Sequence, residues 1–329
     1  MKLHNSLLLV LLALVLWPLS AQSAAGSPAG PNHITGFFHV GFWIRDLEKS
    51  RAFYEKYLGF EEAYTLAFPD GTPSMVVLKV NDRQCIFLFP NPAKILPNGD
   101  NLDHLGLETD DAAALHDELV AKGLKVGAVH KGRVGDLILT VKDPDGHTYE
   151  IVQFLPEGQL MHHQGQDLPA GRISAHLRSV SISVADISAS AKFYRDTLGF
   201  NACHECTTAC QGKESGSCHS SRCDCVEVPN TTDYVVLNPY EKKSGVEQPW
   251  AVSQYCLEVP DVAKTVDTLT QRAAQGSFPP PTPIIVDPEG NRETSVTDPD
   301  GMKVVIMEAH AADGKTPASS DAPPPKASE

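Results

Sequence analysis

The stretch FHVGFWIRDLEKSRAFYEKYLGF at residues 38–60 decides the fold, because the chain repeats it as RSVSISVADISASAKFYRDTLGF at residues 178–200. Two later pairs of segments keep the same order in both halves: LDHLGLETDD (102–111) with SQYCLEVPDV (253–262), and DPDGHTYEIV (143–152) with DPDGMKVVIM (298–307). Self-similarity that extends over several segments predicts two tandem domains with one fold.

Each copy of the repeat has the pattern of a strand followed by a helix. Alternation in residues 38–44 places apolar side chains on one face and His39 and Trp43 on the other; the apolar set is Phe38, Val40, Phe42 and Ile44. Asp46 is the expected N-cap of the helix and Gly59 its expected end. The second copy repeats this arrangement from Asp186 to Gly199.

Short β-like runs follow each helix, and a second strand–helix–strand pattern starts at Leu102. The chain is therefore predicted to be an α+β protein with four βαβββ modules. We expect one domain at residues 33–155, a linker at 156–175, and a second domain at 176–310. Residues 311–329 lack large apolar side chains and are expected to form a disordered tail.

The first 25 residues have the composition of a secretory signal peptide. A short basic start is followed by the apolar run SLLLVLLALVLW and then by small residues suited to cleavage. A membrane anchor is the alternative, but the run is shorter than the ~20 residues that a spanning helix needs. We therefore expect a secreted or periplasmic protein without a membrane span. The net charge of −14 argues against nucleic acid as a partner.

Six of the eight cysteines fall within residues 203–225, in the second copy only. In an exported chain, an even cluster in a Ser- and Gly-rich segment predicts disulfide bonds. Zinc held by thiolates, with help from His204 and His219, is the alternative. Cys85 and Cys256 lie in predicted strands of different domains and are expected to be free.

Four segments recur in the same order in both copies: the strand that carries His39, the FYEKYLGF helix, the DHLGLETDD restart and the DPDGHTYEI ending. Together they resemble the vicinal-oxygen-chelate superfamily. That group includes glyoxalase I, fosfomycin-resistance enzymes, bleomycin-binding proteins and extradiol dioxygenases. The resemblance implies two cup-shaped sheets, each built from two modules, which would make the chain a pseudo-dimer able to act as a monomer. The resemblance covers residues 33–155 and 176–309. It is stronger evidence for the fold than for the reaction, because one fold hosts many chemistries.

The resemblance also implies a metal site in the first cup. At the matching strand positions the first copy carries His39, His104 and Glu150, and strand alternation places all three on the concave face. Two imidazoles and one carboxylate suit a divalent transition metal, namely Fe, Mn, Zn, Co or Ni. The second copy carries residues that cannot replace them: Ser179, Gln254 and Val305. The three ligands meet only if modules one and two share a cup.

Several departures from the relatives bear on the reaction. Phe87 (or Leu88) stands where glyoxalase I supplies a fourth ligand, a Glu, and Thr140 stands where extradiol dioxygenases carry a Tyr. We assign acid–base roles to Glu150 and His130 as hypotheses. Further candidates for substrate binding are Arg133, Trp43 and Phe87, although a solvated basic loop also accounts for Arg133.

Three functions remain open from the sequence. The first is a metal-dependent lyase or dioxygenase acting on a small substrate with vicinal oxygens. The second is a secreted protein that binds or sequesters a small molecule without catalysis. The third is a surface interaction protein that uses the Cys-rich insert as its contact.

Overall fold

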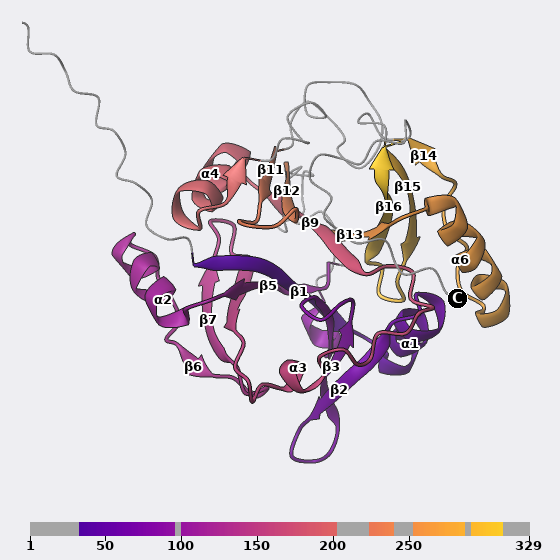
Figure 1. The fold of residues 1–329 in the computed structure, drawn as a ribbon, viewed down its shortest axis with the longest axis horizontal. Coiled ribbons are helices and arrows are strands. Elements are labelled where there is room, and N and C mark those ends of the chain that lie inside the picture. Colours follow the sequence, from indigo (N-terminus) through magenta and orange to yellow (C-terminus); the bar gives the residue numbers. More distant parts are fainter. Residues whose placement is uncertain (1–32, 96–99, 203–223, 240–252, 287–290, 312–329) are drawn as a thin grey trace, which may run out of the picture. The chain divides into compact units, whose positions relative to one another are not determined.

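The computed structural model describes residues 33–95, 100–202, 224–239, 253–286 and 291–311. Within them the chain forms two eight-stranded sheets, one after the other in sequence, and both belong to one compact unit (Figure 1). Each sheet is assembled from two modules, so modules one and two share a sheet as the ligand distribution required. The prediction of two tandem α+β domains is confirmed.

The first sheet has the strand order β2-β3-β4-β1-β5-β8-β7-β6. Its strands are β1 (Ile34–Ile44), β2 (Glu61–Ala67), β3 (Pro73–Lys79), β4 (Cys85–Pro90), β5 (Leu102–Thr109), β6 (His130–Lys131), β7 (Leu137–Lys142) and β8 (Thr148–Gln153). The helices of this domain are α1 (Leu47–Arg51), η1 (Ala52–Tyr57), η2 (Pro92–Lys94) and α2 (Ala112–Ala121). The first strands of the two modules, β1 and β5, pair antiparallel at the centre of the sheet.

The second sheet repeats the arrangement in the order β10-β11-β12-β9-β13-β16-β15-β14. Its strands are β9 (His176–Val184), β10 (Asn201–Ala202), β11 (Asp224–Glu227), β12 (Tyr234–Pro239), β13 (Gln254–Val259), β14 (Ile285–Val286), β15 (Asn291–Thr297) and β16 (Lys303–Ala311). Its helices are α4 (Ile187–Lys192), η3 (Phe193–Thr197) and α6 (Val262–Gly276).

The helix in each repeat begins as predicted but does not stay α-helical. Asp46 accepts a hydrogen bond from the Lys49 amide and so caps α1. From Ala52 to Tyr57 the chain continues as a π-helix, and the second copy does the same in η3. Gly59 ends the first helix with a φ of +81°, a conformation that glycine adopts at little cost. Periodicity alone does not distinguish π- from α-helix, so this feature was not predicted.

One predicted alternation in β1 is wrong at its start. Val40, Phe42 and Ile44 pack in the helix-covered core, as expected, but Phe38 faces the opposite, concave side and Phe37 joins the core instead. The cause is a β-bulge between Phe37 and His39, which shifts the pairing with β5. An extra residue in one strand exchanges the two faces on one side of the bulge.

The segment between the sheets, predicted as a linker, holds the short helix α3 (Gln159–His162). The buried ammonium of Lys79 donates a hydrogen bond to the carbonyl of Gln166, so this segment is tied to the first domain. Cys85 and Cys256 are free and buried, as predicted.

Three predicted features lie wholly or almost wholly outside the described residues: the signal peptide, the C-terminal tail and the Cys-rich insert up to residue 223. Among the described residues no helix has the length and apolar character to cross a membrane.

Candidate metal centre

Three neighbouring strands bring the predicted ligands together on the concave face of the first sheet. His39 on β1 pairs with Gly106 on β5, and Gly106 pairs in turn with Glu150 on β8. His104 lies two residues before Gly106 and so shares its face of β5. The row His39–Gly106–Glu150 therefore has a gap at its centre, where glycine has no side chain.

The ligand atoms of the three residues converge. The Nε2 atoms of His39 and His104 lie 2.7 Å apart, and each lies 3.7 Å from Oε2 of Glu150. In the plane of these three atoms, the point equidistant from them lies about 2.0 Å from each. This is the length of a bond from Zn²⁺ to nitrogen or oxygen. The donor set therefore fits one divalent transition metal, and these residues would hold it.

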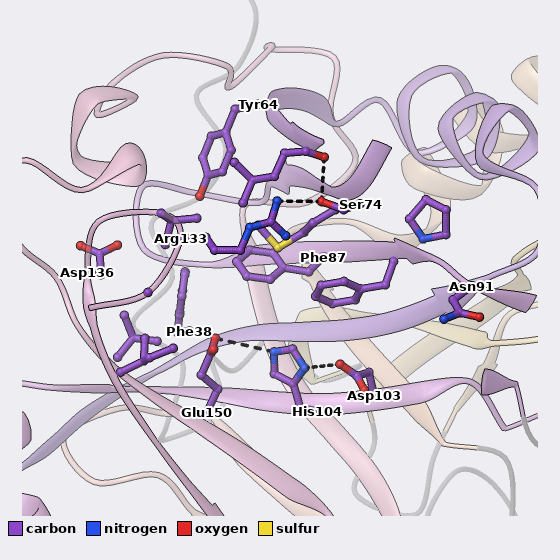
Figure 2. Close-up of a pocket in the computed structure, with 18 of the residues that line it drawn as sticks. Phe38, Tyr64, Ser74, Phe87, Asn91, Asp103, His104, Arg133, Asp136 and Glu150 are labelled. Atoms are coloured by element: carbon purple, nitrogen blue, oxygen red, sulfur yellow. Dashed lines mark hydrogen bonds and ion pairs between the residues drawn. The ribbon is translucent and has the colours of Figure 1, made fainter. Parts of the chain in front are cut away.

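Asp103 orients the His104 imidazole. Its Oδ2 lies 2.7 Å from Nδ1 of His104, so this nitrogen carries the proton and Nε2 keeps its lone pair for the metal (Figure 2). Burial acts to lower the pKa of His104, but the hydrogen bond to Asp103 and the charges of Glu150 and Asp103 outweigh it and raise that pKa. A carboxylate behind a ligand histidine is the usual arrangement in metal sites.

Packing holds the His39 ring, whose Nδ1 makes no hydrogen bond with any described residue. It is fully buried and stacks on Phe87 with 4.1 Å between ring centroids, and a Cβ built on Gly106 would lie 2.1 Å from its Nδ1. Burial lowers the pKa of His39 well below its ordinary value, and His104 nearby lowers it further. His39 is therefore neutral at physiological pH, the form that binds a metal.

A cavity of about 520 Å³ opens in front of this group of residues, and its walls are mostly apolar and aromatic. Figure 2 shows His104 and Glu150 on one side of it and Arg133 with Ser74 on the other. The apolar lining consists of Phe38, Trp43, Tyr64, Leu66, Phe68, Met75, Phe87, Phe89, Val134, Ile138 and Val152. Such a lining suits the apolar body of a small molecule.

The residues predicted to bind substrate all line this cavity, but they differ in their partners. Trp43 and Phe87 belong to the aromatic wall. Arg133 donates hydrogen bonds from one Nη to the carbonyl of Ala67 at 2.9 Å and to the hydroxyl of Ser74 at 3.0 Å, so it ties its loop to the β2–β3 hairpin. Part of its hydrogen-bonding capacity is therefore used within the protein.

His130, predicted as an acid–base residue, lies in β6 at the cavity and is exposed. Its Nδ1 lies 3.0 Å from the carbonyl of Ala128, which leaves Nε2 for a ligand. Sequence reasoning missed three residues of the site: Asp103, Gly106 and Tyr64. Asp103 directly precedes a predicted ligand, and Gly106 shares its face, so both could have been found from the sequence.

In the described part of the second domain there is no equivalent group of ligands. Among the residues that the structure describes, His39, His104 and Glu150 are the one set of three His, Cys, Asp or Glu side chains with converging ligand atoms. The corresponding residues of the second domain form a different surface. Gln254 donates to the Ser181 hydroxyl at 3.3 Å, and Val305 packs with Cys256 and Met307.

Fold and donor set together define a vicinal-oxygen-chelate protein. The sequence profile of the Glyoxalase/Bleomycin resistance protein/Dioxygenase superfamily matches residues 36–151 and again residues 175–306. The chain belongs to this superfamily.

Individual relatives include both lyases and dioxygenases. A lactoylglutathione lyase from Arabidopsis thaliana is 27% identical over 180 residues, which cover 50% of this chain and 54% of the relative. An iron-dependent extradiol dioxygenase from Rhodococcus jostii (strain RHA1) is 34% identical over 142 residues, covering 38% and 46%. The chain thus spans about half the length of the curated relatives it matches.

Solved structures share the fold across most of the chain. The Mn(II)-bound glyoxalase from Novosphingobium aromaticivorans has a TM-score of 0.58 at 17% identity, covering 84% of this chain and 82% of that one. An extradiol ring-cleaving dioxygenase from B. fuscum has a TM-score of 0.59 at 15% identity, covering 89% and 76%. At these identities the likeness concerns the fold alone.

Proposed function

We propose that the protein is a metal-dependent enzyme acting on a small substrate with two adjacent oxygen atoms. One observation carries the proposal: the ligand atoms of His39, His104 and Glu150 converge at the side of an apolar cavity. A divalent metal bound there supplies Lewis acidity to the substrate oxygens. Lyase and dioxygenase chemistry are both compatible with this donor set, and the named relatives include one of each.

The residues of the chain divide the remaining tasks. The aromatic wall formed by Trp43, Phe87 and Phe89 holds the substrate body and excludes water from the reacting oxygens. The second carboxylate oxygen of Glu150 and the Nε2 of His130 are the groups that can accept or return a proton. Tyr64 adds a phenol at the same cavity; burial raises its pKa, and the nearby acidic groups raise it further, so it stays protonated and can donate.

Activity measurements on reconstituted protein test this proposal. Metal-free protein is loaded separately with Fe(II), Mn(II), Zn(II), Co(II) or Ni(II) and assayed with catechols for oxygen uptake and with 2-oxoaldehyde–thiol adducts for isomerisation. The expected result is turnover with at least one metal and its loss in Glu150→Ala. A metal-loaded wild type without turnover on either class contradicts the enzymatic proposal.

The second candidate is a binding protein without catalysis. Two features favour it, because neither requires a reaction: the apolar cavity of the first domain, and a second domain whose described residues hold no converging set of metal ligands. Calorimetric titration of metal-free protein with the same compounds distinguishes the two candidates. Tight binding that is equal with and without metal supports sequestration over catalysis.

We also propose that the chain is exported, with residues 1–25 removed, and that the Cys-rich insert is closed by disulfides. The composition of the first 25 residues supports export. The even cluster of cysteines in a Ser- and Gly-rich segment supports the second proposal. N-terminal sequencing of the mature protein tests the first, and an unprocessed start at Met1 contradicts it.

A further inference from the structure

The turn that leads into the Glu150 strand is held by a residue of the other domain. Asp143 begins the DPDG turn before β8, and its Oδ2 accepts a hydrogen bond of 2.7 Å from the phenol of Tyr194 in η3. The same phenol accepts a hydrogen bond of 3.0 Å from Tyr149, the residue next to Glu150. Tyr194 therefore contacts both the start of the turn and the neighbour of a metal ligand.

A second contact fixes the same turn from the same helix. Asp145 accepts hydrogen bonds from the Ala185 amide at 2.8 Å and from the Ser190 hydroxyl at 2.9 Å. Asp143 is also bonded within its own turn, to the amide of His147 at 2.8 Å. The two acids of the turn thus connect the first domain to the start of the helix in the second.

The two hydrogen bonds of the Tyr194 phenol are shielded from water. Tyr194 and Tyr149 are fully buried, and Asp143 is 5% exposed. A buried hydrogen bond to a charged group is stronger than an exposed one, and removing one partner leaves the other unsatisfied. The turn consequently cannot shift without a cost in free energy.

Because the two domains are repeats, the first domain makes an equivalent contact with the second. In the opposite direction, Tyr54 of the first domain donates a hydrogen bond of 3.0 Å to Asp298 in the DPDG turn before β16. The amide of Arg45 donates to Asp300 in that turn at 3.0 Å. The strand that follows carries Val305, which is no metal ligand.

We propose that Tyr194 is a positioning residue for the metal site, which gives the second domain a role in the activity of the first. The inference rests on the proposed metal site. Distances from a metal to its ligands tolerate deviations of only about 0.2 Å. A small shift of β8 therefore moves Glu150 out of bonding range, whereas the same shift of β16 moves no ligand.

The pseudo-symmetric pair Tyr194→Phe and Tyr54→Phe tests this. Each variant of the full-length chain loses one buried phenol that donates to an aspartate. We expect both to lower the melting temperature of the metal-free protein by similar amounts. Tyr194→Phe should weaken the affinity for Mn²⁺ or Zn²⁺, measured by chelator competition, about 10-fold, and Tyr54→Phe should leave it within about 2-fold of wild type.

The outcomes separate this inference from the proposed function. Wild-type protein that binds no metal contradicts the proposed function itself. Wild type that binds metal, with equal affinity in the two variants, overturns the positioning role alone. If either tyrosine variant fails to fold, Asp143→Asn and Asp298→Asn test the same contacts, because Asn has nearly the same shape as Asp. Asp143→Asn is then expected to weaken the metal affinity more than Asp298→Asn does.

Discussion

Gly106→Ala is the substitution whose effect on the metal site follows most directly from the geometry. The added Cβ would lie 2.1 Å from Nδ1, 2.3 Å from Cε1 and 2.6 Å from Cγ of His39. Ordinary contacts begin at 3.4 Å, so the ring would have to move by about 1 Å, five times the deviation that a metal–ligand distance tolerates. Phe87 is stacked on the His39 ring and hinders this movement.

We expect Gly106→Ala to remove His39 from the ligand set. Chelator competition should show a loss of at least about 100-fold in metal affinity, and urea unfolding of the metal-free protein should show a loss of about 1–3 kcal/mol from overpacking. Gly36→Ala is the matched control, because it lies on the same pair of strands and its Cβ would meet nothing closer than 3.5 Å.

A double variant isolates the mechanism. Combining Gly106→Ala with His39→Ala removes the overlap, so the stability lost in the single glycine variant should partly return while metal affinity stays at the level of His39→Ala. Wild-type metal affinity in Gly106→Ala would refute the reasoning. It would mean that the His39 ring can still reach the metal despite the added Cβ.

Further predictions concern other parts of the molecule. Asp103→Asn should weaken metal affinity about 10-fold in chelator competition, since it weakens the hydrogen bond that orients His104; unchanged affinity contradicts that role. Burial lowers the pKa of His176, but the hydrogen bond to Asp233 and the nearby carboxylate of Glu258 outweigh it and raise the pKa to about 9. This contribution to stability is therefore complete below pH 6.5 and lost as the pH rises through 9, with a ceiling of about 3 kcal/mol; His176→Gln should flatten the pH dependence of unfolding over that window. Thiol counting on denatured, unreduced protein should find about two free thiols, from Cys85 and Cys256, whereas six or more with bound zinc would favour the metal alternative for the insert.

The repeat made the overall fold predictable, and strand alternation predicted which face would carry the three candidate ligands. Strand periodicity placed His104 and Glu150 on the concave face without any knowledge of pairing. The β-bulge at Phe37 was not predictable in this way, because Phe37 and Phe38 are both apolar and either could face the core. Local pattern therefore specifies a face only where the two faces differ in polarity.

Features that depend on contacts far apart in sequence were also missed. The sequence shows the FY and DPDG motifs in both halves, but not that Tyr194 of one half bonds to Asp143 of the other. Gly106 was visible as a small residue, yet the need for glycine comes from the His39 ring packed against it. The second copy carries none of the three candidate ligands, yet it has the tyrosine and the aspartates that contact the first.

Metal content is the measurement that tests the central claim most directly. Purified wild-type protein and Glu150→Ala are dialysed against the same buffered divalent metal and analysed by elemental analysis. The structure predicts one ion per chain in the wild type and a large loss in the variant, because one of three converging ligands is gone. Equal metal content in both proteins would contradict the assignment of His39, His104 and Glu150 as the metal site.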